Sequence, residues 1–471
     1  MGLGAALACG GPAAAQAPPD TLSYAVAISL APPHVTVEAR LTVAESASIS
    51  LLAPPAIRSS GSDVTGFLAT DARGHWLTTA RSGTRYVVET APGAMHFRYR
   101  LDFQNAVAMS STGAGLDSAR LYAAGRSVFL APDPAAYRRT ARPYPVVYVH
   151  ISAPPGWHVV TGWGVDGAVF VPSGGDALLG ATIAAAPDFR IYDDRAAGAR
   201  FVLAIRGERH FSDSALIAVI AASLTRAAQA LGPVPVPLVT YTGDTGPKGR
   251  TSGSLQGRSS IGLIWEPGDL LERARSEDVF HETLHLWFGG ALETDRWWTE
   301  GVTDYYAARL YAEGTGQPND LAEPCYESLQ DYLTITHNTL LTMDQEDRSD
   351  VAGDNTELLV YRKGMLAGLL LDAAIRRSTE GQATLDDVAR RLLAMAAERR
   401  SRVIRGAEIR SVAVEVGGDD VARVWDRVVD GTSLISADEV TEALRIVAGV
   451  GAPTDHPRAK ELKVLSNHPK G

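Results

Sequence analysis

The residues best suited to chemistry form one short stretch, His-Glu-Thr-Leu-His, at positions 281–285. On a helix, His281 and His285 would project from the same face, with about 5–6 Å between their Cβ atoms. That separation allows two imidazoles to bind one tetrahedral zinc ion. Glu282 would lie beside the metal, where it could take a proton from water and later give it to a leaving amine. A purely structural role for the histidines would leave Glu282 without a task, so the spacing favours a hydrolytic zinc site.

A catalytic zinc site needs a third protein ligand and keeps its fourth position open. The segment WWTEGVTDYYAARL (297–310) offers carboxylates at the start of a second expected helix. Glu300 is the preferred third ligand, because a carboxylate in the first turn of that helix can reach back to the histidines. Asp304 and Asp295 are the alternatives, and Asp304 is also suited to orienting a ligand through a hydrogen bond.

These two segments together resemble the gluzincin peptidases, in which an HExxH helix is followed by a W-x-x-E-G helix. A later segment that begins with YRKG (361–364) resembles its counterpart in the glycyl aminopeptidase family and, more distantly, in the aminopeptidase N family. The likeness is strong over residues 200–400 and loose before them. It implies that His281, His285 and Glu300 are the zinc ligands. It also implies that Glu282 is the general base and that Tyr361 is the donor that stabilises the oxyanion.

The sequence departs from the family pattern in two places. The gap between His285 and Glu300 is shorter than in the aminopeptidase N relatives.

The second departure lies in the segment that meets the substrate's α-amine. The families carry G-x-x-E, and the match here is Gly253, Ser254, Leu255 and Gln256. An amide accepts a hydrogen bond from an ammonium group but brings no opposite charge. We therefore expect altered recognition of a free N-terminus: blocked or internal amides, unusual amino acids, or weaker exopeptidase action.

Arg258 follows this segment directly. It could favour a substrate that carries a carboxylate, or it could be a solvated loop arginine.

The functional residues favour a zinc-dependent metallopeptidase, aminopeptidase-like but with altered amine recognition. One Zn²⁺ is the expected cofactor, and a peptide or amide is the expected substrate. The first alternative is a non-catalytic, zinc-stabilised protein that binds peptides or acts as a scaffold, which Gln256 would suit. The second is a zinc hydrolase of other specificity, such as an endopeptidase or an epoxide or ester hydrolase. Glu282 and Tyr361 argue against a purely structural zinc site, because such a site requires neither.

The composition of the 471-residue chain is typical of a globular protein, with 45% hydrophobic and 21% charged residues. The formal net charge of −10 leaves no basic face, so nucleic acid is not an expected partner. No run of about 18 apolar residues follows the first twenty, and we expect no transmembrane span.

The first twenty residues, MGLGAALACGGPAAAQAPPD, are small and carry no charge before Asp20. They resemble the end of a secretory signal with a cleavage site at residues 13–15, and the alternative is an Ala/Gly/Pro leader without that role. Cys9 could attach a lipid, although Ala6 stands where a large aliphatic residue is preferred. If the leader is removed, Cys325 is the only cysteine left, which excludes an intrachain disulfide. We expect an exported, periplasmic protein.

The elements that must position the site are expected in successive parts of a multidomain α+β fold. Residues 21–200 alternate β-rich runs with Gly, Pro, Ser and Asp turns, which predicts an antiparallel β-sandwich-like domain. By the resemblance, residues 201–315 form a thermolysin-like mixed α/β catalytic domain that contains the HExxH helix. Residues 316–450 are expected to be a helical domain, with a leader (1–20) before these parts and a polar tail (451–471) after them.

Finer patterns divide the second and third parts into elements. RFVLAIRGE and PLVTYTGD predict strands on either side of a helix capped by Asp213 or Ser214, and residues 249–265 a Gly/Ser loop that enters a strand. Helical periodicity predicts helices near 270–289, 296–312, 320–336, 356–378, 384–400 and 418–447.

Overall fold

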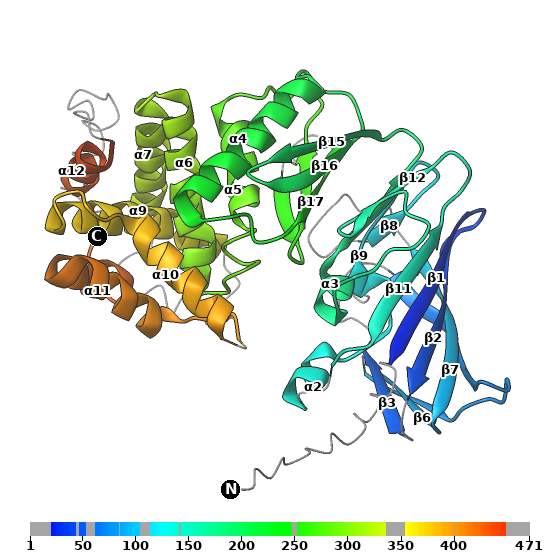
Figure 1. Ribbon diagram of the computed structural model, residues 1–471. Coiled ribbons are helices and arrows are strands. Elements are labelled where there is room, and N and C mark those ends of the chain that lie inside the picture. Colours follow the sequence, from blue (N-terminus) through cyan, green and yellow to red (C-terminus); the bar gives the residue numbers. More distant parts are fainter. Residues whose placement is uncertain are drawn as a thin grey trace, which may run out of the picture.

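The computed structural model of the protein describes residues 20–43, 47–52, 62–83, 85–103, 114–140, 143–246, 252–335, 354–399 and 401–448. Three parts follow one another along the chain: β-sheets, a mixed α/β middle and a helical C-terminal part (Figure 1). The multidomain α+β class predicted from the sequence is therefore confirmed. The expected leader with Cys9 and the polar tail lie outside the described residues.

The N-terminal part consists of sheets because its apolar residues alternate along the strands. In β1 (Thr21–Leu30), Leu22, Tyr24 and Val26 are buried, and the residues between them are more exposed. The three sheets have the orders β11-β1-β2-β7-β4, β10-β3-β6-β5 and β13-β12-β14-β9-β8. Pairing in them is antiparallel, as predicted, except that β1 and β11 run parallel. The N-terminal sheets enclose an apolar core of their own.

The other elements of the N-terminal part range from long strands to two-residue strands and short helices. They are β2 (Pro33–Val43), β3 (Ala47–Leu52), β4 (Ser62–Asp71), β5 (Thr79–Ser82), β6 (Arg85–Thr90), β7 (Gly93–Phe103), β8 (Ala114–Leu116), β9 (Leu121–Ala124), η1 (Gly125–Ser127), β10 (Ala131–Pro132), α2 (Pro134–Arg139), β11 (Val146–Ser152), β12 (His158–Thr161), β13 (Gly164–Val165), α3 (Gly175–Gly180) and β14 (Thr182–Ala186).

The middle part is built on a five-stranded sheet of order β15-β16-β17-β19-β18. Its inner strands are parallel, and each edge strand pairs antiparallel with its neighbour. The bounds are β15 (Arg190–Ala196), β16 (Ala199–Ile205), β17 (Leu238–Thr245), β18 (Ser252–Gln256) and β19 (Ser260–Trp265). The predicted domain boundary at residue 200 falls inside the β15–β16 hairpin.

Helix α4 (Asp213–Leu231) packs on this sheet through Leu216, Ile220 and Leu224. Its cap is Ser212, whose side chain accepts a hydrogen bond from the Ala215 amide, so the predicted caps Asp213 and Ser214 are wrong. The cap position requires extended backbone, which Ser212 adopts. Within the described residues, α4 alone is long and apolar enough to cross a membrane, but its inner side belongs to the core.

Helices follow the strands of the middle part and form the rest of the described chain. They are α5 (Arg273–Leu284), η2 (Trp297–Val302), α6 (Thr303–Thr315), α7 (Asn319–Thr334), α9 (Asp354–Ser378), α10 (Leu385–Glu398), α11 (Gly406–Val424), η3 (Trp425–Val429) and α12 (Ala437–Ala448). They share one apolar core with the middle part, in which Trp297 packs against Trp298 and Trp425.

The single helix predicted at 418–447 is wrong. Gly418 has φ of +64°, which interrupts α11, and the chain leaves helical structure after η3. A new helix, α12, starts after Ser436, whose hydroxyl and amide both donate to the Glu439 carboxylate. Glycine at the break and serine at the new start therefore divide the stretch into separate helices.

The N-terminal part is attached to the hairpin of β18 and β19. Ser259 donates to the Gly162 carbonyl at 3.2 Å, and Thr240 donates to the Thr161 carbonyl at 3.0 Å. Gly257, in the hairpin turn, has φ of +65°, and a Cβ there would lie 2.7 Å from the Gly180 backbone. This contact between glycines fixes the hairpin whose edge strand, β18, borders the site.

Candidate metal centre

Two imidazole rings from one helix face a carboxylate from another segment. His281 lies in the last turn of α5, and His285 directly follows Leu284 at its end. The Nε2 atoms of both rings lie 3.6 Å from the same oxygen, Oε2 of Glu300 in η2. The ring centroids of the histidines are 4.6 Å apart, and the rings are nearly perpendicular. The three side chains thus surround one point in space.

The other nitrogen of each ring is already hydrogen-bonded. Nδ1 of His281 lies 2.7 Å from the Asp304 carboxylate, and Nδ1 of His285 lies 2.9 Å from the Phe288 carbonyl. Both partners accept, so each Nδ1 carries a hydrogen, and Nε2 is the nitrogen through which either ring, when neutral, could bind a metal. Asp304 therefore contacts His281 from the side away from Glu300, a position from which a carboxylate can orient a metal-binding ring.

The site attracts positive charge. Burial lowers the pKa of His281, but the Asp304 and Glu300 carboxylates raise it more, and the net pKa is well above its usual value. Burial raises the pKa of Glu300, but the hydrogen bonds to both histidines outweigh it, and the net pKa is lowered. A cation at this point would satisfy the same carboxylate and both imidazoles.

The donor set fits zinc. Two neutral imidazoles and one carboxylate form a common ligand set of catalytic zinc sites, with bonds of about 2.0–2.2 Å. Tetrahedral angles would place the ligand atoms about 3.3 Å apart, close to the 3.6 Å between Glu300 and each histidine. Glu282 also stands close to this point, because potential ligand atoms of His281, Glu282 and His285 lie within 4.8 Å of one another.

Glu300 lies in η2, which is a π-helical turn rather than the first turn of an α-helix. A π turn carries an extra residue per turn and is common at functional sites. Behind Glu300, Gly301 lies against Gly364 of α9: a Cβ at Gly301 would be 2.5 Å from the Gly364 Cα. The two glycines therefore allow η2 and α9 to touch backbone to backbone beside the site.

Glu282 is buried beside the histidines, with 8% of its surface exposed. Its Oε2 atom has no hydrogen-bond partner among the described residues. Burial raises the pKa of Glu282, although the neighbouring histidines oppose the shift. Gly253 of β18 leaves the room that this side chain needs, because a Cβ there would lie 2.3 Å from the Glu282 Cγ. A desolvated carboxylate with an unused oxygen is well suited to proton transfer.

Tyr361 of α9 faces the same cluster. Its ring lies 6.4 Å from the His281 ring, nearly parallel to it. Burial and the hydrogen-bonded Glu300 carboxylate both raise the pKa of Tyr361, so the phenol stays a donor. Two residues along, Lys363 is fully buried and donates to the Gly431 carbonyl at 3.2 Å, which ties α9 to the segment after η3.

Two cavities, of about 420 and 400 Å³, meet at the cluster. Gly253, His281, Glu282 and Tyr361 line both. Ser254, Leu255 and Gly257 of the β18–β19 hairpin line the smaller cavity together with Thr299 and Glu300. A substrate that crosses the cluster would therefore extend into both cavities.

Two of the residues named from the sequence, Arg258 and Asp295, lie away from the cluster, and a third, Gln256, has no described side chain. The backbone of Gln256 pairs with Ser260, but its side chain is outside the described part of the structure. Arg258 is exposed and lines neither cavity at the cluster; burial and the nearby Arg402 lower its pKa. Asp295 accepts hydrogen bonds from the Gly406 amide and from Arg405, so it serves the start of α11 rather than the histidines.

The sequence matches no family model and no curated protein. Solved structures are similar in fold. An aminopeptidase N family protein from Idiomarina loihiensis is 17% identical, with a TM-score of 0.74 over 89% of this chain and 78% of that one. An M1 zinc metallopeptidase from Deinococcus radiodurans is 13% identical, with a TM-score of 0.57 over 89% of this chain and 96% of that one.

Yeast LTA4 hydrolase is 14% identical, with a TM-score of 0.55 over 88% of this chain and 68% of that one. A substituted form of the Deinococcus radiodurans enzyme holds a Tyr-Ser-Ala substrate. At these identities the likeness concerns the fold. The chain has the fold of the M1 aminopeptidase N-type zinc metallopeptidases, with a β-sheet part, a mixed middle and a helical C-terminal part.

Proposed function

We propose that the protein is a zinc-dependent metallopeptidase that hydrolyses peptide or amide bonds. One observation carries the proposal: two imidazole Nε2 atoms, each fixed by a bonded Nδ1, lie at equal distance from one Glu300 oxygen. The fold that the chain shares with M1 metallopeptidases supports it. So does the peptide substrate held by one of those proteins.

The chain's own residues divide the reaction between them. A bound zinc ion would lower the pKa of water and polarise the carbonyl of the substrate. Glu282 takes the proton of the attacking water on its free Oε2 and passes it to the leaving nitrogen. The Tyr361 hydroxyl donates a hydrogen bond to the carbonyl oxygen of the substrate as that oxygen gains negative charge. Asp304 keeps His281 oriented throughout.

The resemblance to the glycyl aminopeptidases and Gln256 refine the proposal. An amide at this position would bind a free α-amine more weakly than a carboxylate does. We therefore assign aminopeptidase-like activity with altered amine recognition, in an exported, periplasmic protein. The second candidate, a zinc-stabilised protein that only binds peptides, is favoured by the same glutamine.

The test compares short peptides with free and with acetylated N-termini, with and without a chelator, and identifies the products by mass. We expect chelator-sensitive cleavage. Glu282→Gln should lower the rate about 10³-fold or more, since an amide cannot take up the proton, while zinc stays bound. Glu415→Gln, a change at an exposed surface carboxylate, is the matched control. A Glu282→Gln protein of near-normal rate would refute the assigned role, and a zinc-loaded protein without activity would support the second candidate.

A further inference from the structure

The larger cavity at the metal centre lies where α5, α6, α7 and α9 meet. Away from the cluster residues, its lining is mainly charged: Arg275, Glu277, Asp278, Asp304, Glu327 and Arg362. The smaller cavity differs: among the residues that the structure describes, Glu282 and Glu300 are the only carboxylates that line it, and no arginine or lysine of that part of the chain does. The two sides of the cluster therefore offer different environments to a substrate.

Carboxylates outnumber guanidinium groups around the larger cavity. Arg275 is paired with Asp278 at 3.0 Å and with Asp269 at 3.4 Å, and Arg362 is paired with Asp331 at 3.0 Å. A third arginine, Arg273, is shared by the carboxylates of Glu277, Glu323 and Glu327. Of the described residues, five carboxylates line the cavity against the two guanidinium groups of Arg275 and Arg362. Both of these arginines already have a carboxylate partner.

Two buried carboxylates at this cavity lack full compensation. The Glu282 Oε2 atom lines it without a hydrogen-bond partner and is nine-tenths buried. Burial raises the pKa of Glu277 to about 8, even though Arg273 lies 3.2 Å away and opposes the shift. A pKa of about 8 leaves Glu277 largely protonated at neutral pH, and a cation that entered the cavity would favour its ionised form.

The rest of the wall is apolar. Ala307 and Ala308 of α6, Pro324 of α7 and Met365 of α9 line it between the charged groups. An apolar wall that ends in carboxylates matches a side chain with a methylene stem and a charged tip. A volume of about 420 Å³ is sufficient for such a side chain.

We propose that this cavity binds a cationic side chain of the substrate, of the lysine or arginine type, beside the bond that is cleaved. The position beside that bond rests on the proposed function, because the cavity shares Gly253, His281, Glu282 and Tyr361 with the smaller one. An acidic side chain is the opposite possibility, since Arg275 and Arg362 also line the cavity. Their existing ion pairs argue against it.

The first experiment measures binding without turnover. Butylguanidine and its uncharged isostere butylurea are titrated into the zinc-loaded protein by calorimetry. We expect butylguanidine to bind about two- to fivefold more tightly, as for a partly exposed ion pair. Glu327→Gln should reduce this preference, and Glu277→Gln with Glu327→Gln should remove it. Glu323→Gln is the control, because Glu323 pairs with Arg273 but does not line the cavity.

The second experiment measures cleavage of alanine-based peptides that carry lysine, norleucine or glutamate on either side of the cleaved bond. We expect lysine to raise kcat/KM about fivefold over norleucine on one side, and Glu327→Gln to remove that gain while the norleucine peptide is unaffected. Equal rates for the three side chains on both sides, or a preference for glutamate, would overturn the proposal.

The two experiments separate this inference from the proposed function. Carboxylate-dependent binding of butylguanidine without cleavage of any peptide would leave the cation site standing and remove the peptidase assignment. Cleavage without preference, together with equal binding of butylguanidine and butylurea, would do the reverse. Glu327 is partly exposed at the cavity, so its replacement should leave folding intact even if the buried Glu277 proves essential to it.

Discussion

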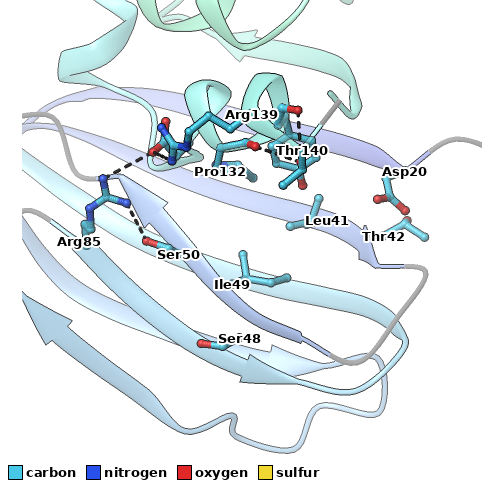
Figure 2. A pocket seen from close by; sticks show the side chains of 13 residues that line it. Asp20, Leu41, Thr42, Ser48, Ile49, Ser50, Arg85, Pro132, Arg139 and Thr140 are labelled. Atoms are coloured by element: carbon cyan, nitrogen blue, oxygen red, sulfur yellow. Dashed lines mark hydrogen bonds and ion pairs between the residues drawn. The ribbon is translucent and has the colours of Figure 1, made fainter. Parts of the chain in front are cut away.

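Two hollows of the molecule gather charged side chains, and they differ in how those charges are used. The hollow in the N-terminal sheets, of about 310 Å³, is lined by Arg85 and Arg139 (Figure 2). Asp133 pairs with these two arginines at 3.5 and 3.8 Å. Both arginines are largely exposed. At the metal centre the carboxylate of Glu282 and the two imidazoles are nearly buried.

Local structure explains the first hollow but not the second. Asp133 caps α2, since its carboxylate accepts a hydrogen bond from the Ala135 amide at 2.9 Å. Its two arginines remain in contact with water, so their ion pairs with Asp133 require little desolvation and contribute little to the stability of the fold. Glu282 has no comparable structural task, and an unpartnered buried carboxylate is costly. A cluster of charged side chains is therefore a poor guide to function, whereas a buried charged group that stabilises no structural element is a good one.

The strongest test of this comparison after Glu282 is Tyr361→Phe. Loss of the donor should lower kcat about 10²–10³-fold with little change in zinc content, because the hydroxyl acts on the charge that develops during the reaction. Steady-state kinetics and metal analysis measure this. Tyr144→Phe, which removes a hydrogen bond to the Pro132 carbonyl near the first hollow, should leave kcat unchanged. If both variants behave alike, the distinction between the hollows fails.

A smaller effect is expected from Asp304→Ala. Without its acceptor, His281 loses the hydrogen bond that orients it, and zinc affinity should fall about 10–100-fold. Competition with a chromogenic chelator measures the change. Asp304→Asn keeps an acceptor oxygen and should lose less. Unchanged zinc affinity in Asp304→Ala would show that the ring is held by its packing instead.

The smallest effect should come from the first hollow. Asp133→Ala removes the cap of α2 and should cost about 1 kcal/mol of unfolding free energy, measured by urea titration. Peptide hydrolysis should stay within a factor of two of the unsubstituted protein. A larger loss of activity would mean that the hollow is coupled to the metal centre, about which the structure gives no indication in the described residues.

The sequence was informative where chemistry depends on local spacing. One helical turn brings His281 and His285 together, and the order of β-rich and helical segments follows from periodicity alone. The π turn that carries Glu300 was not foreseen, because the spacing of residues in WWTEGV does not distinguish it from the first turn of an α-helix. Nor was the charged cavity, since Glu277 and Glu327 lie on helices far apart in sequence. Ser212 was missed as the α4 cap because adjacent polar residues differ only in backbone conformation.

The contact between Gly301 and Gly364 has a consequence for how this site can evolve. No side chain separates the two segments at this contact, so side-chain size cannot adjust how closely η2, which carries Glu300, approaches α9, which carries Tyr361. Substitutions elsewhere in the core can change its volume without altering that spacing. A change in the distance between η2 and α9 would require a shift of a whole helix, because there is no side chain at this contact whose size could change gradually.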